Sequence, residues 1–166
     1  MLCNIFKVNG EKHIGKLIIS IIIAEGVGAI SAFLGMSNQE MYSQLVKPVF
    51  SPPGWVFPIV WIILFFLMGT AAYRVWIRGK QGEKVKRALV LYVVQLVLNF
   101  MWTIIFFRFQ LYGLAFLELM ILLVFILMTT FEFSRIDKTA AYLMIPYILW
   151  VSFAGILNYA IWMLNE

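Results

Sequence analysis

Two stripes of amide and aromatic side chains are spaced as on one face of a helix, each within an otherwise apolar stretch. The first stripe is Gln95, Asn99, Trp102 and Phe106, and the second is Tyr147, Trp150, Ala154 and Asn158. Amides hydrogen-bond and indole rings stack, so faces of this kind can hold a flat, apolar, polycyclic ligand. They equally suit polar contacts between packed helices in a membrane. The spacing alone leaves both interpretations open.

The chain contains six tryptophans. Three of them lie near the ends of apolar stretches, where the aromatic belt of membrane proteins explains them: Trp55, Trp76 and Trp162. The other three lie deeper: Trp61, Trp102 and Trp150. Rings at that depth either stack on a planar ligand or fill the core of a helix bundle.

Two carboxylates interrupt apolar stretches, and a charge in hydrocarbon is costly. Glu25 is either a proton-coupling carboxylate, as in small drug exporters, or a protonated or hydrogen-bonded helix contact. Glu118 lies close to the start of its stretch, nearer the membrane interface, and faces either an inner cavity or the lipid headgroups. Besides binding of a flat apolar ligand, the alternative function is therefore that of a proton-coupled exporter of small hydrophobic compounds that uses Glu25.

The chain lacks the residues that several kinds of chemistry require. Cys3 is the one cysteine and His13 the one histidine, so neither a disulfide framework nor a Cys/His metal cluster is available. The chain also lacks a phosphate-binding loop, a dinucleotide glycine motif, a Ser/His/Asp set and zinc spacing. We expect no metal and no cofactor.

Composition predicts an integral membrane protein. Hydrophobic residues make up 63% of the 166 positions and charged residues 13%, about half the usual charged share of a soluble domain. Five stretches reach the roughly 20 residues that a span requires: about 17–36, 53–73, 88–107, 113–131 and 139–164. We predict an all-α integral membrane fold, a single five-span domain over residues 1–166, with a partly helical lid loop between the first two helices.

The basic residues are distributed unevenly over the connections. Three precede the first span, six lie between positions 74 and 87, and two lie between the fourth and fifth spans, whereas Lys47 and Arg108 lie on the other side. Positive charge is retained on the cytoplasmic side during insertion, so this predicts an N-terminus inside and a C-terminus outside. The asymmetry fits a bacterial plasma membrane better than an organelle, and it explains the net charge of +5 without a nucleic-acid partner.

The first connection, Ser37 to Pro52, is long enough for one or two amphipathic turns around Met41, Tyr42 and Leu45. Its prolines make a stiff entrance to the second span. In the first span, small residues at helical spacing predict a ridge for close helix approach, within the chain or in a homodimer: Ala24, Gly28 and Ala32.

Three sequence strings together resemble the translocator proteins, also called tryptophan-rich sensory proteins or peripheral benzodiazepine receptors. They are Lys47-Pro48-Val49-Phe50-Ser51-Pro52-Pro53 followed by Trp61, Gln95-Leu96-Val97-Leu98-Asn99-Phe100-Met101-Trp102 with Phe106-Phe107, and Pro146-Tyr147-Ile148-Leu149-Trp150-Val151-Ser152-Phe153-Ala154-Gly155-Ile156-Leu157-Asn158. Their order and spacing extend the resemblance over about residues 17–163. The five-helix fold of that family agrees with the span count obtained independently.

The resemblance implies a receptor or sensor with one pocket inside the bundle, covered by the first long connection, that binds porphyrin-like tetrapyrroles and other planar hydrophobic ligands. The residues at matching motif positions are Tyr42, Pro52, Phe57, Trp61, Phe65, Gln95, Asn99, Trp102, Trp150 and Ala154. Some relatives are thought to degrade protoporphyrin in light, which would make Trp61 and Trp150 catalytic. The resemblance also implies a second possible activity, transport of the bound ligand.

The chain departs from the family pattern at two places. Phe50 stands where the family usually has tryptophan, an aromatic exchange that keeps lid packing. Leu157 and Tyr159 remain from the C-terminal cholesterol motif of mammalian members, but no basic residue follows them. Sterol recognition through that motif is not expected here.

Overall fold

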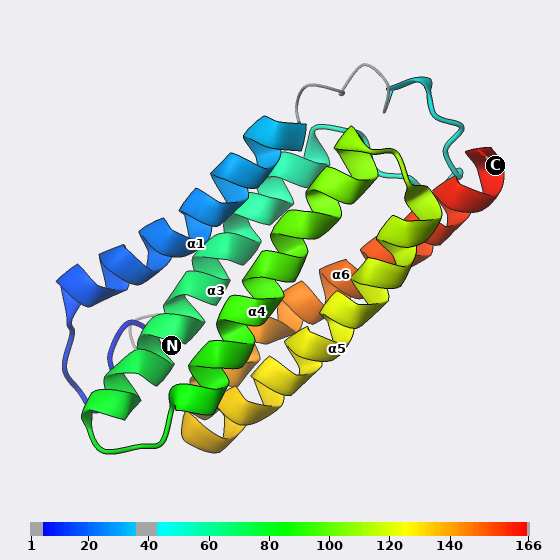
Figure 1. Cartoon of the computed structure of the whole chain (residues 1–166). Coiled ribbons are helices and arrows are strands. Elements are labelled where there is room, and N and C mark those ends of the chain that lie inside the picture. The colour runs from blue at the N-terminus through cyan, green and yellow to red at the C-terminus, as the bar shows by residue number, and fades with distance from the viewer. Residues whose placement is uncertain (1–4, 36–42, 166) are drawn as a thin grey trace.

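The computed structural model describes residues 5–35 and 43–165, most of which are helical (Figure 1). The long helices are α1 (Ile14–Gly35), α3 (Val56–Lys80), α4 (Lys86–Thr103), α5 (Tyr112–Ile136) and α6 (Lys138–Asn165), and a π-helical turn, η3 (Ile104–Arg108), extends α4. Within those residues, five helical segments are long and apolar enough to cross a membrane, and no strand forms. The predicted bundle of five membrane-spanning helices is confirmed.

The helices close into a ring. Helix α1 packs on α3, α3 on α6, α6 on α5 and α5 on α4, and α4 returns to α1. Helix α6 thereby contacts both α3 and α5. The side chains of the second polar stripe that are buried, Tyr147, Ala154 and Asn158, lie on α6. This arrangement positions both polar stripes inside the bundle.

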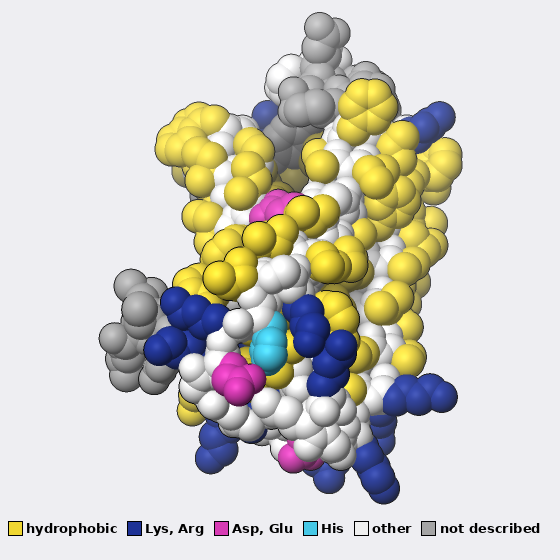
Figure 2. All heavy atoms as spheres, turned by 90° about the vertical axis from the view of Figure 1, so that its left-hand side faces the viewer, with side chains coloured by type: hydrophobic (Ala, Val, Ile, Leu, Met, Phe, Trp, Pro, Cys, Tyr) yellow, Lys and Arg dark blue, Asp and Glu magenta, His cyan; other side chains and the backbone are white. Residues whose placement is uncertain are grey.

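The outside of the ring is apolar along its length. Large side chains on all five helices are more than half exposed, among them Ile22, Ile62, Val97, Leu117 and Leu149. Figure 2 shows one such hydrophobic face, with basic side chains gathered around the histidine toward one end. In water this surface would drive association, whereas lipid chains cover it at no cost.

Helices α1 and α3 approach closely because small residues line their contact. A Cβ atom on Gly69 would stand 2.7 Å from the Cα atom of Ile21, and the Ser20 hydroxyl donates to the Gly69 carbonyl oxygen at 2.7 Å. Gly28, from the predicted small-residue ridge, faces the ring of Phe65, whose nearest atom would lie 2.4 Å from an added Cβ. This part of the ridge packs α1 on α3 within one chain.

We call the end of the bundle that carries the N-terminal residues the basic end; a buried ion pair organises it. The Arg74 guanidinium donates to both carboxylate oxygens of Asp137 at 3.0 and 2.9 Å. It also donates to the carbonyl oxygens of Ile5 and Lys7 at 2.7 and 2.8 Å. Asp137 accepts from the backbone N–H of Ala140 at 2.9 Å and so caps the start of α6. The pair thus joins the N-terminal segment, α3 and the junction of α5 and α6.

This network explains why α3 is longer than its hydrophobic stretch. The predicted second span ends at Tyr73, whereas α3 continues to Lys80. Arg74 is only 6% exposed, and its charge is balanced there by Asp137. Arg78, one turn further on, also reaches Asp137 at 3.4 Å. The helix therefore carries charges in its last turns without leaving one buried and unpaired.

Candidate ligand cavity

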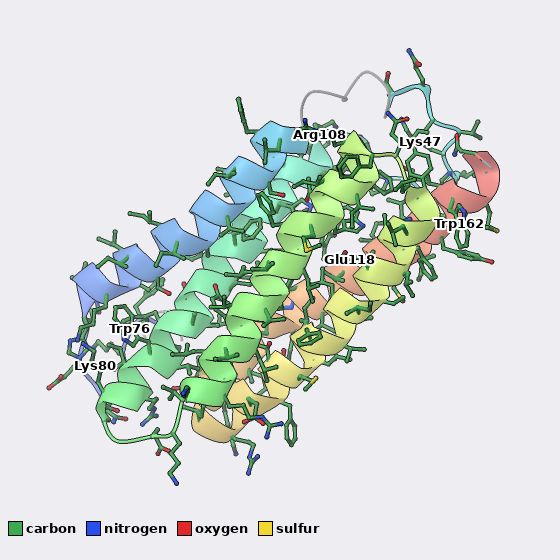
Figure 3. The ribbon with its side chains drawn as sticks, in the orientation of Figure 1. Lys47, Trp76, Lys80, Arg108, Glu118 and Trp162 are labelled. Carbon is green, nitrogen blue, oxygen red and sulfur yellow. The ribbon has the colours of Figure 1, made fainter. Side chains whose placement is uncertain are left out.

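A cavity of about 670 Å³ opens at the opposite end of the bundle, which we call the lid end. The loop residues 43–54, here named the lid segment, lie over it, and Figure 3 shows Lys47 of that segment at this end. The lining comes from the lid segment, the start of α3, the end of α4 with η3, and the second half of α6: Ser43, Lys47, Pro48, Ser51, Pro52, Pro53, Gly54, Trp55, Phe57, Pro58, Trp102, Phe106, Phe107, Ala154, Leu157, Asn158 and Ile161.

The indole of Trp102 is fixed in the cavity wall. Its Nε1–H donates to Oδ1 of Asn158 at 3.1 Å, and the amide nitrogen of Asn158 donates to the carbonyl oxygen of Tyr112 at 2.8 Å. The ring centroids of Phe106 and Phe107 lie 5.4 and 6.1 Å from that of Trp102. The amide of Asn158 therefore orients the indole, and the aromatic face is preformed.

The lid segment is fastened to the end of α6. The backbone N–H of Val46 donates to Oδ1 of Asn165 at 3.0 Å, and the amide nitrogen of Asn165 donates back to the Val46 carbonyl oxygen at 2.9 Å. Phe50 packs edge-on against Phe153, with centroids 6.4 Å apart. The aromatic exchange at Phe50 thus leaves a ring contact between the lid segment and α6.

The polar groups of the lining are few. Lys47 is the one charged side chain among the described lining residues. The hydroxyl of Ser51 is buried and has no hydrogen-bond partner within the described ranges. An anionic group entering the cavity would therefore meet a lysine and a free hydroxyl donor, while a planar apolar body would meet aromatic and aliphatic walls.

The structure brings four of the predicted site residues directly to the cavity: Pro52, Phe57, Trp102 and Ala154. Trp61, Phe65 and Trp150 lie behind this lining. The ring of Trp61 stands 6.4 Å from Trp102 and 5.6 Å from Phe65. The ring of Trp150 stands 5.7 Å from Phe57. These three side chains form a second aromatic layer in contact with the first.

The two predicted amides lie deeper. Asn99 is 2% exposed and donates to the hydroxyl of Tyr147 at 2.9 Å, and the Tyr147 ring stands 6.2 Å from Trp61. Gln95 is fully buried on α4. The remaining predicted residue, Tyr42, lies outside the described residues, as does Met41 of the predicted amphipathic turns. Of that stretch the structure describes residues 43–45, of which 43 and 44 are helical.

Sequence reasoning missed several lining residues. Leu157 and Ile161 continue the stripe of Ala154 and Asn158 on α6, so the helical spacing was a signal that could have found them. Phe107 lies in the π-helical turn η3 and also lines the cavity, and its position next to Phe106 in the sequence was the available signal. Glu25 is partly exposed on α1 and is not among the lining residues.

Five apolar helices with an aromatic, lid-covered cavity at one end define a small multi-pass integral membrane protein. The chain belongs to the TspO/MBR family, whose model matches residues 19–163. It is 40% identical over 156 residues to the tryptophan-rich protein TspO of Chlorobaculum tepidum, covering 93% of this chain and 99% of that one. It is also 36% identical over 149 residues to the tryptophan-rich sensory protein of Cereibacter sphaeroides, covering 90% and 91%, and 36% identical over 137 residues to the human translocator protein, covering 82% and 81%.

Proposed function

We propose that this protein is a membrane receptor or sensor that binds porphyrin-like tetrapyrroles and other planar hydrophobic ligands in the lid-end cavity. The observation that carries the proposal is a cavity of about 670 Å³ walled by Phe57, Trp102 and Phe106. Small-molecule sites commonly measure about 300–1,000 Å³ and are lined by aromatic groups with a few polar ones. Both the size and the chemistry of this cavity match that description.

Different lining residues would bind different parts of the ligand. The rings of Trp102 and Phe57 would stack on the planar body of the ligand. Lys47 and the unpartnered hydroxyl of Ser51 would bind the carboxylates that tetrapyrroles carry at their edge. The second aromatic layer and the two deeper amides would hold this lining in place: Trp61, Phe65 and Trp150, with Gln95 and Asn99. Tyr42, which lies outside the described residues, is predicted to contact the ligand as well.

The proposal is tested by titrating the full chain in lipid nanodiscs with protoporphyrin IX, following tryptophan fluorescence and the porphyrin absorption band. Phe57→Ala removes a lining ring, and its matched control, Phe66→Ala, removes a ring that is 39% exposed on the same helix. An aromatic pair contributes about 0.5–1.5 kcal/mol beyond its buried area, so Phe57→Ala should weaken binding about 2- to 12-fold. Trp61→Phe and Trp150→Phe should also weaken binding.

Either of two results would contradict the proposed ligand site. Equal affinity of Phe57→Ala and Phe66→Ala, both as tight as the unaltered chain, would place the ligand outside the cavity. Quenching that persists at the same strength after thermal denaturation would show that protoporphyrin only partitions into lipid.

The orientation that follows from the charges is part of the proposal. The N-terminus and the basic end would face the cytoplasm of a bacterial cell, and the cavity would open near the outer face. Figure 3 shows Lys80 at the basic end, away from Lys47 at the lid end. A ligand in the outer leaflet or the medium would then reach the cavity without crossing the bilayer.

A further inference from the structure

Two lysines and a tryptophan lie together at the basic end, where the start of α1 packs against the end of α3. Leu17 of α1 packs on the buried cluster that contains Ile77 of α3. Because the two helices are antiparallel, this contact places Lys16 level with Trp76. Figure 3 shows Trp76 and Lys80 beside the start of α1.

The two lysines, here named the lysine pair, approach each other and the indole ring. The side chains of Lys16 and Lys80 lie within hydrogen-bonding reach of each other, and the ammonium group of Lys80 stands 5.4 Å from the centroid of the Trp76 ring. Lys80 is exposed, whereas Lys16 and Trp76 are half-buried. None of the ion pairs among residues 5–35 and 43–165 involves either lysine, and Glu11, which precedes α1, contacts His13 instead at 3.4 Å.

The topology of the chain does not by itself account for this contact. Retention of positive charge during insertion explains why lysines gather at one end of the bundle, and Figure 2 shows basic side chains around the histidine there. It gives no reason for two ammonium groups to meet, because like charges at short range repel each other. A phosphate group between them would accept a hydrogen bond from each lysine and replace the repulsion by attraction. The lysine pair is therefore suited to binding a phosphate.

The surface of α1 that continues from the lysine pair toward the middle of the bundle is apolar. Ile19 and Ile23 follow Lys16 at helical spacing on the same face, and they are 50% and 57% exposed. The half-buried ring of Trp76 lies beside the pair, and indole rings are typical of the level of the lipid headgroups. A phosphate that carries acyl chains would therefore gain contacts on this surface, whereas a soluble phosphate would not.

We propose that the lysine pair binds the phosphate of an anionic phospholipid whose acyl chains lie along Ile19 and Ile23. Such a lipid would join α1 to α3 and relieve the repulsion between the two ammonium groups. A zwitterionic phospholipid has the same phosphate, but its choline cation would be repelled by the lysines, so we expect a preference for the anionic headgroup. The site lies at the end of the bundle opposite to the ligand cavity and does not rest on the proposed function.

Native mass spectrometry of the full chain in a mild detergent tests the site, because it counts the phospholipid molecules bound to each protein. The protein is titrated with phosphatidylglycerol and, separately, with phosphatidylcholine of the same acyl chains. We expect the unaltered chain to bind the first phosphatidylglycerol more tightly than phosphatidylcholine. Lys16→Gln/Lys80→Gln should weaken phosphatidylglycerol binding at least about tenfold, which corresponds to the loss of one hydrogen bond between charged groups.

The matched control removes the same charge from the same end of the bundle. Lys84→Gln/Lys86→Gln changes two exposed lysines outside the pair and should weaken phosphatidylglycerol binding less than about threefold. Lys16→Arg/Lys80→Arg keeps both charges and should retain the preference. Equal losses in the two glutamine variants would show that only the general positive charge attracts the lipid, and equal binding of both phospholipids to the unaltered chain would overturn the anionic headgroup site.

Glycerol 3-phosphate distinguishes a lipid site from a site for a soluble phosphate, because it carries the headgroup phosphate without acyl chains. At the same concentration as phosphatidylglycerol, it should not displace the bound lipid from the unaltered chain. Displacement of the lipid under these conditions would show that the lysine pair binds soluble phosphates, and the lipid assignment would be wrong. Circular dichroism of every variant verifies that the helices are intact, since the substituted lysines pair with no acidic side chain in the described part of the chain.

Discussion

Replacing Asp137 by asparagine isolates the charge that Arg74 requires. The asparagine side chain still accepts from the Ala140 N–H and caps α6, so the change removes the charge and keeps the cap. Arg74 is 6% exposed and would keep the neutral carbonyl oxygens of Ile5 and Lys7 as acceptors, but no longer the charge of Asp137. Breaking a buried ion pair at one partner costs about 3–5 kcal/mol, because it leaves an uncompensated charge. We expect Asp137→Asn to lower the free energy of unfolding by that amount.

The assay is reversible unfolding of the full chain in mixed micelles, followed by helical circular dichroism. Arg74→Met/Asp137→Asn is the informative double variant, since it leaves neither charge buried without the other. It should be more stable than the sum of the two single losses predicts, by about 0.5–3 kcal/mol. A loss below about 1 kcal/mol for Asp137→Asn, together with additive single effects, would refute the view that this ion pair organises the basic end.

The carboxylate of Asp137 should also make the stability of the fold depend on pH in the acid range. Burial by itself would raise the pKa of Asp137. The hydrogen bonds that Asp137 accepts from Arg74 and from the Ala140 N–H, together with the positive charges of Arg74 and Arg78, outweigh this effect. They hold the pKa of Asp137 below its usual value. A carboxyl group whose pKa is lower in the folded than in the unfolded chain stabilises the fold at pH values above its unfolded pKa, which is about 3.9. That contribution is lost as the pH falls below about 4 and through the folded value. Asp137→Asn should lack this component of the acid unfolding curve.

Two further predictions concern helix packing and orientation. Gly69→Ala places a methyl group 2.7 Å from the Ile21 backbone and should destabilise the bundle by about 1–3 kcal/mol; Gly26→Ala, with no described heavy atom within 4 Å, is the control and should leave stability within about 0.5 kcal/mol. Cys3 is the one thiol of the chain, so a membrane-impermeant maleimide should label intact bacterial cells only after permeabilisation. In a Cys3→Ser chain, Glu166→Cys should be labelled without permeabilisation, and the reverse pattern in the two chains would contradict the proposed orientation.

The sequence predicts the helices well because hydropathy is a local property. Each of the five apolar stretches overlaps one long helix of the structure. The ends are less predictable, because they depend on partners far along the chain. The helix that contains Arg74 extends past its apolar stretch since Asp137, 63 positions later, balances the charge. Nothing near Arg74 in the sequence carries that information.

The candidate site shows the same division. Helical spacing alone placed Asn99 and Trp102 on one inward face, and both are buried. Spacing does not give depth, so it could not separate Trp102 in the cavity wall from Gln95 further inside. It also could not show that Glu118 lacks a described partner, because that depends on which side chains α4 and α6 turn toward it.

The most direct test of the ligand cavity is to fill it. Ala154→Phe adds a ring at a lining position of α6, and Ile156→Phe adds the same ring at a position that is 63% exposed on the same helix. The measurement is the dissociation constant of protoporphyrin IX in nanodiscs for both variants, with folding verified by circular dichroism. We expect at least about tenfold weaker binding for Ala154→Phe, a loss of about 1.4 kcal/mol, and unchanged binding for Ile156→Phe. Unchanged affinity in a folded Ala154→Phe protein would show that the ligand does not occupy this cavity.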